Sequence, residues 1–285
     1  MKPFAPFAVL LFVACLACRE APSPFQAAKE SIAKNDLAGA KSLLKASLAD
    51  GRLDLDGELL LAELQRREGD ASGAIMSLRA TAERHANDPR SLVMLGRIYG
   101  ESGQSAQALE SLRAARGRGA PDQMLALDMG TALAQAGRID EARSEFERAR
   151  KSGMEPHVVD YNLGLLEVQK GDAAAALALF EAAHAANPEW GPARRELARA
   201  LLLQAPGDTK VADRALDLLV AKLEAFKEDW RAQEAIGDAW LALGDIDAAL
   251  QAYVEALRAG QNPKSVEERY RTAKLRQKER DAAQK

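Results

Sequence analysis

The feature that most constrains this chain is a small residue that recurs at a fixed interval. One stands at each step of 34 positions, at Ala28, Ala62, Gly96, Gly130, Gly164 and Ala198. The next step, from Ala198 to Gly237, is 39 residues. A self-similar period of this length is typical of repeat architectures, in which one supersecondary unit is stacked many times. The chain is therefore expected to form a repeat array.

We call a set of residues that recurs with this period a ladder. Two further ladders keep the same register as the first. Alanines stand at Ala40, Ala74, Ala108, Ala142, Ala176, Ala215 and Ala249, and four residues after each comes a larger apolar residue, at Leu44, Leu78, Leu112, Phe146, Phe180, Leu219 and Tyr253. Residues that tolerate the left-handed backbone ending a helix stand at Asn35, Gly69, Gly103, Gly137, Gly171 and Gly244. Acidic residues follow several of them, at Asp70, Asp172 and Asp245, and are expected to cap the next helix. Each repeat is thus predicted to be two helices joined by a tight turn.

The combined pattern resembles the tetratricopeptide repeat (TPR) family, whose motif runs from a large apolar residue through Leu-Gly and an aromatic residue to Ala, an aromatic residue, Ala and Pro. The segment 157–188 carries it best, at Leu163, Gly164, Ala176, Phe180, Ala183 and Pro188. The resemblance covers roughly residues 21–262. It implies an all-α fold, a right-handed TPR superhelix (α-solenoid) of about seven helix-turn-helix hairpins.

Packing explains the ladders. Small residues such as Gly96 and Ala108 let two antiparallel helices approach, and the large residue of the second helix is expected to fill the space between neighbouring hairpins. No hairpin can bury its apolar face alone, so stability comes from stacking. Two hairpins depart from the pattern: the first, about residues 21–52, lacks the Leu-Gly pair, and the sixth is expected to contain a longer turn at 205–209.

The predicted boundaries are a TPR array over residues 25–262 and a charged segment over 263–285. The segment has few apolar residues, and their roughly helical spacing favours a C-terminal cap helix. A basic arm is the alternative, although several acidic residues dilute its charge.

The first eighteen residues are expected to be an export signal. Lys2 precedes an uncharged, mostly apolar run over 4–17, which is too short for a membrane-spanning helix. A small residue before a cysteine after such a run resembles the lipobox of bacterial lipoproteins, in which the cysteine is lipidated. Cys18 is the favoured lipidation site and Cys15 the alternative, with residues 19–24 as a short linker. An ordinary cleaved signal or an uncleaved anchor remains open. Arg19 after Cys18, rather than Asp, favours the outer membrane by the same resemblance.

Composition argues against several function classes. The net charge of −3 supplies no basic field for nucleic acid. Both cysteines lie at the N-terminus, so the body is expected to contain no disulfide and no cysteine metal site. None of the three histidines has a second His or Cys at a spacing that would bring them together. The sequence also contains neither a nucleophile elbow nor a phosphate-binding glycine loop. We therefore expect no catalytic residues, no metal and no cofactor.

The TPR resemblance implies that ligands bind along the first helices of the hairpins. Helical spacing selects the side chains outside the Leu-Gly packing row: Arg90, Val93, Arg97, Met124, Leu127, Thr131, Val158, Tyr161, Asn162, Leu165, Arg195, Arg199, Glu234 and Asp238. The predicted groove is apolar in the middle, basic on either side and acidic at its C-terminal end. It suits a peptide with apolar anchors and an acidic flank. Asn162 matches a family position that hydrogen-bonds a bound peptide's backbone.

Two alternatives stay open for these residues. Val93, Leu127 and Tyr161 could pack between adjacent first helices, and Arg195 and Arg199 could form a solvated face. The predicted function is a scaffold for protein or peptide partners, anchored by lipid at the periplasmic face of a bacterial envelope membrane. It would assist assembly of a type IV pilus, an exopolysaccharide exporter or the outer membrane. The alternatives are an adaptor for peptidoglycan hydrolases or proteases, and a self-associating module, such as a homodimer.

Overall fold

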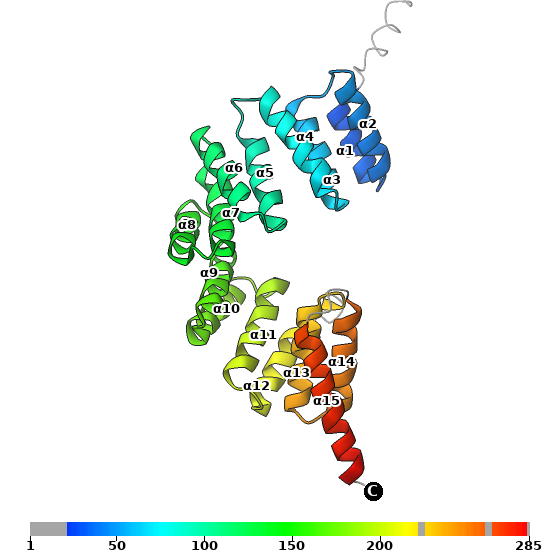
Figure 1. The fold of residues 1–285 in the computed structure, drawn as a ribbon, viewed down its shortest axis with the longest axis vertical. Helices are drawn as coiled ribbons and strands as arrows, with labels where there is room; N and C mark the ends of the chain where they lie inside the picture. Colours follow the sequence, from blue (N-terminus) through cyan, green and yellow to red (C-terminus); the bar gives the residue numbers. More distant parts are fainter. Residues whose placement is uncertain (1–21, 222–225, 260–263, 284–285) are drawn as a thin grey trace, which may run out of the picture. The chain divides into compact units, whose positions relative to one another are not determined.

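The computed structural model describes residues 22–221, 226–259 and 264–283. Within these ranges the chain forms fifteen α-helices and no β-strand. The first fourteen helices pair in chain order into seven hairpins, and the fifteenth follows the last hairpin (Figure 1). The all-α repeat architecture expected from the sequence is confirmed. Cys15 and Cys18 lie outside the described residues.

Contacts between Cα atoms divide the chain into two compact units, one ending at Ala120 and one beginning at Pro121. The first unit holds three hairpins, made of α1 (Pro24–Ala33), α2 (Leu37–Ala49), α3 (Leu55–Arg67), α4 (Ala71–Arg84), α5 (Arg90–Glu101) and α6 (Ser105–Gly117). The first hairpin is folded although it lacks the Leu-Gly pair, because Ala28 and Leu44 are fully buried between its helices and α3.

The second unit holds four hairpins and the final helix. Its helices are α7 (Asp122–Gln135), α8 (Ile139–Lys151), α9 (Pro156–Lys170), α10 (Ala173–Ala186), α11 (Gly191–Gln204), α12 (Thr209–Val220), α13 (Trp230–Ala242), α14 (Ile246–Arg258) and α15 (Lys264–Ala283). Val266 and Ala273 bury α15 against Tyr253 of α14. This confirms the cap helix and not the basic arm.

The turns within the hairpins follow the third ladder. All six of its residues have positive φ, from 61° at Asn35 to 83° at Gly171. The acidic residues after them cap the second helices: the Asp70 carboxylate accepts a hydrogen bond from the Gly73 amide at 2.8 Å, and Asp245 accepts one from Ala248 at 2.9 Å. A sharp helix stop followed directly by a cap explains why so short a turn can reverse the chain.

The small residues of the first ladder lie against the large residues of the second. A Cβ atom built on Gly164 would lie 2.6 Å from Cε1 of Phe180, and one on Gly96 would lie 2.4 Å from Cγ of Leu112. The expected role of the large residue is thus confirmed and extended. Phe180 covers the glycine of its own hairpin and also packs on Leu197 of the next.

The sixth hairpin has five residues more than the 34-residue period, and most of them lie outside the turn where the longer connection was expected. The predicted long turn is only four residues, 205–208, against three between α5 and α6. Compared with that hairpin, one extra residue extends α11, one lengthens the turn and three lie at the start of α12. Asp208 makes this possible, because its carboxylate caps α12 at Lys210 and Val211. The predicted longer turn is present, but it holds only one of the five extra residues, because most of the insertion is helical.

None of the helices in the described ranges is long and apolar enough to cross a membrane.

Candidate functional site

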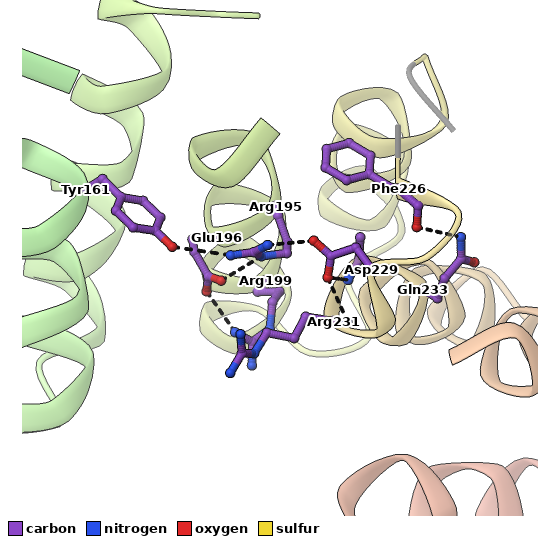
Figure 2. Close-up of polar contacts among 9 residues, drawn as sticks. Tyr161, Arg195, Glu196, Arg199, Phe226, Asp229, Arg231 and Gln233 are labelled. Carbon is purple, nitrogen blue, oxygen red and sulfur yellow. Dashed lines mark hydrogen bonds and ion pairs between the residues drawn. The ribbon is translucent and has the colours of Figure 1, made fainter. Parts of the chain in front are cut away.

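A largely buried arginine joins three elements of the second unit. Arg195, on α11, donates from Nη2 to the Tyr161 hydroxyl on α9 at 3.2 Å, and from Nε to Glu196 at 2.9 Å. Its Nη1 donates to the carboxylate of Asp229, which caps α13, at 2.6 Å (Figure 2). The side chain is only 14% exposed. Arg195 therefore links neighbouring hairpins through its hydrogen bonds.

The ionisation of this cluster follows from its burial and charges. Burial alone would lower the pKa of Arg195, but the hydrogen bond to Asp229 and the charges of Glu196 and Asp229 outweigh it and raise the pKa. Burial raises the pKa of Tyr161. Near neutral pH the arginine is charged and the tyrosine is neutral, so the tyrosine oxygen can accept the hydrogen bond.

Aromatic rings hold Tyr161 in place beside this arginine. Its ring centroid lies 5.0 Å from that of Trp190 in an edge-to-face arrangement, and 6.0 Å from that of Phe180. His157 packs edge-on to Trp190 at 4.9 Å. The packing interpretation of Tyr161 is therefore correct, and the expectation that Tyr161 is an open binding residue is wrong, since its ring and its hydroxyl are both engaged.

Arg199 is only partly engaged. Its Nη1 donates to the second oxygen of Glu196 at 2.8 Å, so this one carboxylate bridges Arg195 and Arg199. The Arg199 side chain is 32% exposed. The two predicted basic residues thus differ: Arg195 is largely buried, and Arg199 keeps part of its guanidinium open. Neither forms the simple solvated face considered as the alternative.

The acidic end of the groove is neutralised by α15. Arg269 lies 3.1 Å from the Glu234 carboxylate and also pairs with Asp238. Tyr253 donates its hydroxyl to Asp238 at 2.7 Å. Glu234 is itself only 4% exposed. The prediction of an acidic rim at Glu234 and Asp238 was wrong, because the final helix supplies a counter-charge that helical spacing could not reveal.

In the first unit, one of three predicted groove residues is buried. Val93 is 3% exposed and packs in the core, which contradicts its assignment to the groove. Arg90 pairs with Asp88 at 3.1 Å and with Asp56 of the preceding hairpin at 2.6 Å. Arg97 is exposed. The basic flank predicted at this end is thus partly neutralised.

The middle of the predicted groove contains a small cleft between α7 and α9. Its volume is 270 Å³, and it is lined by Thr131, Asn162 and Leu165 among others. Asn162 donates from Nδ2 to the Val158 carbonyl of its own helix at 2.7 Å, and Thr131 donates to the Leu127 carbonyl. The amide donor expected to meet a peptide is therefore used within the helix. The side chain of Met124 lies outside the described residues.

A larger cleft of 480 Å³ lies between α11, α13 and α15. Its lining includes Arg199, Leu203, Glu234, Arg269 and Arg276. Leu203 is 63% exposed. Sequence reasoning missed Leu203, Arg269 and Arg276. All three lie in or beside the sixth hairpin's insertion and the C-terminal segment, where the repeat pattern fails, and that failure was the signal available in the sequence.

The described part of the chain contains no group of three or more His, Cys, Asp and Glu side chains placed to hold a metal ion. What the second unit offers is guanidinium groups beside exposed leucine. That chemistry suits recognition of another chain.

The repeat pattern and the fold have counterparts among known proteins. The tetratricopeptide repeat profile matches residues 93–156, 127–189 and 207–263. No curated protein sequence matches the chain.

Several solved structures share the fold. A tetratricopeptide repeat protein from Parabacteroides merdae is 17% identical, with a TM-score of 0.68 over 88% of this chain and 97% of its own. Pseudomonas aeruginosa PilF is 19% identical, with a TM-score of 0.62 over 78% of this chain and 97% of its own. PilW, a widely conserved type IV pilus biogenesis factor, is 19% identical, with a TM-score of 0.60 over 76% of this chain and 97% of its own.

At these identities the solved structures are evidence of fold alone, whereas the profile match is evidence of family. Its ranges cover more than half of the sequence, and the first two begin 34 residues apart, which is the period of the small residues. The chain therefore belongs to the tetratricopeptide repeat family.

Proposed function

We propose that this protein is a non-catalytic scaffold held at a bacterial envelope membrane by a lipid on Cys18, with Cys15 as the alternative. It binds partner proteins or peptides along its first helices and assists assembly of an envelope complex. Its site is periplasmic, at the outer membrane. The type IV pilus is the first complex to test, before exopolysaccharide export and outer-membrane biogenesis.

One observation carries the proposal. The fold resembles those of PilF and PilW over 97% of their chains, and the sequence that precedes the fold ends an apolar run in Ala17-Cys18. PilW is a type IV pilus biogenesis factor. A repeat scaffold beside a membrane could hold a pilus subunit during assembly, and the open clefts of the second unit supply surfaces for it.

The anchor is tested by metabolic labelling with an alkyne fatty acid in a bacterial host. The wild-type chain and Cys15→Ala are expected to incorporate the label and to sediment with the outer membrane, and Cys18→Ala is expected to lose it. Loss in Cys15→Ala alone would move the lipid to Cys15. Absence of label from the wild type would contradict the lipid anchor.

The partner is tested by photo-crosslinking in the organism that encodes the chain. A photoreactive phenylalanine replaces Leu165, which is 37% exposed beside the small cleft. The control replaces Met76, which is 70% exposed on α4. Subunits of one envelope assembly should crosslink at Leu165 and not at Met76. Murein enzymes or proteases would support the adaptor alternative, and self-crosslinking would support the self-associating alternative.

A further inference from the structure

Two of the places where the chain departs from its repeat meet at one cleft. Pro206 and Gly207, in the enlarged sixth hairpin, line the same 480 Å³ space as Arg269 and Arg276 of the helix that follows the array. Departures from an otherwise consistent pattern tend to occur at functional sites. A helix that only covered the last hairpin would not need to share a cleft with the insertion, since three helices separate the two along the chain.

In this cleft the acidic side chains are paired, whereas the basic side chains are only partly paired. Three guanidinium groups line it, at Arg199, Arg269 and Arg276, against the carboxylates of Glu234 and Asp238. Arg269 pairs with both carboxylates. Neither acid is therefore available to a cationic ligand.

The other two arginines keep donors open. Among the described residues, Arg199 donates only from Nη1, to Glu196. Within the described ranges Arg276 is exposed and makes no side-chain hydrogen bond or ion pair. Guanidinium groups bind carboxylates through two parallel hydrogen bonds, which gives both energy and orientation. The cleft is therefore complementary to an anion with carboxylate geometry.

An apolar surface lies beside these donors. Leu203 is 63% exposed, and Leu202, Leu241 and Ala242 line the same space. Burying an exposed leucine side chain stabilises a complex, because it removes apolar surface from water. A ligand that satisfied the arginines alone would leave this apolar surface in water, so the better fit has an apolar group next to its carboxylate.

We propose that this cleft binds a partner-protein segment in which an Asp or Glu side chain lies next to a bulky apolar one. The α15 helix is then part of the binding surface as well as a cap. The inference rests on the proposed scaffold function and names the partner chemistry for one of its sites. Arg276 and Arg199 hold the carboxylate, and Leu203 with its apolar neighbours holds the apolar side chain.

The test uses a phage-displayed library of random dodecapeptides, selected on the full chain purified in detergent. Selected peptides are expected to pair an acidic residue with a bulky apolar neighbour. Their dissociation constants, measured by fluorescence anisotropy, should rise at least about tenfold in Arg276→Glu and Leu203→Asp. The affinity should also fall with added salt, because the arginines are partly exposed.

Matched controls separate local contact from general charge. Arg271→Glu changes another α15 arginine, whose side chain is 74% exposed and pairs with Glu267 outside the cleft. Met76→Asp changes an exposed apolar residue of the first unit. Both should change the dissociation constant less than about twofold, in line with the small effect of isolated surface charges.

Four results would overturn the inference: no peptide selected, selected peptides without acidic residues, peptides that bind Arg276→Glu and Leu203→Asp as tightly as wild type, or a concentration-dependent dimer that Arg276→Glu dissociates. The last would assign the cleft to a second copy. None of these results removes crosslinks formed at Leu165. Failure of the inference is thus distinguishable from failure of the scaffold function, which would also abolish those crosslinks.

Discussion

At the scale of single residues, the repeat is built from a glycine and a large side chain sixteen positions later. Gly96 with Leu112, Gly164 with Phe180, and Gly237 with Tyr253 follow this spacing. Each glycine is helical and each partner side chain is fully buried or nearly so. Glycine is required at these positions because there is no room for a Cβ atom. Its backbone conformation is that of an ordinary helix and imposes no such requirement.

The first prediction compares two glycines of α5. Gly96→Ala should lower the free energy of unfolding by about 1–3 kcal/mol, because the new methyl group meets the fully buried Leu112. Gly100→Ala should raise it by about 0.5–1 kcal/mol, because nothing lies within 4 Å and alanine favours a helix. Urea unfolding measures both. Equal effects of the two substitutions would contradict the close-packing explanation.

The second prediction concerns acid stability. Hydrogen bonds from Arg66 and Arg67 outweigh burial and lower the pKa of Glu63 to about 2. The stabilisation by ionised Glu63 is therefore complete above the unfolded-state pKa of 4.5 and is lost as pH falls from 4.5 towards about 2. Glu63→Gln should destabilise the protein at about pH 6 and much less at about pH 2.5. Urea unfolding at both pH values checks this, and a difference that is constant with pH would refute it.

At the scale of elements, α15 does more than its sequence indicates. Its few apolar residues bury one stripe against α14, and its Arg269 neutralises two acids on α13. The side chain of Glu234 is 6% exposed, so without this arginine its charge would be buried unpaired. Helix attachment here depends on electrostatic pairing as well as on apolar burial.

The third prediction tests that attachment. Arg269→Gln should lower the free energy of unfolding by about 2 kcal/mol or more, because it leaves the Glu234 carboxylate buried without its counter-charge. Adding Glu234→Gln should recover part of the loss. Arg271→Gln, at the 74% exposed control position, should change stability by less than about 0.5 kcal/mol. Unfolding measurements on the single and double variants decide this, and no recovery in the double variant would argue against the pairing.

At the scale of the whole molecule, most contacts run between helices next to each other in the chain. Solenoids of this kind have stabilities that are approximately a sum of repeat and neighbour terms. The contacts further divide at Ala120 and Pro121 into two compact units. We therefore expect the two units to unfold separately.

The fourth prediction follows from that division. Phe180→Ala should destabilise the second unit by about 3–5 kcal/mol, because it empties the space over Gly164 and beside Leu197. Native-state hydrogen exchange should show lower protection in α9 to α12 and unchanged protection in α1 to α4. An equal loss of protection in α1 to α4 would show that the chain unfolds as one unit.

Much of the fold was predictable because it depends on local spacing. The turn ladder placed Gly171 and its neighbours in the left-handed region, and Asp70 and Asp245 at helix caps, from register alone. The candidate site was less predictable. Val93 and Tyr161 share one register position, yet the first is a core residue and the second is tied to Arg195. Periodicity assigns a residue to a helix face and does not say what covers that face.

The repeat family, the seven hairpins and the close contacts at Gly96, Gly164 and Gly237 follow from the sequence, because they depend on residue size and spacing within one hairpin. Which charges are paired and which surfaces are open depends on how the hairpins pack on one another. Arg195 meets Asp229 and Arg269 meets Asp238 across 34 and 31 residues, from one hairpin or helix to another. Long charged side chains pair with whichever opposite charge lies close in space, and the repeat period along the chain does not specify those distances.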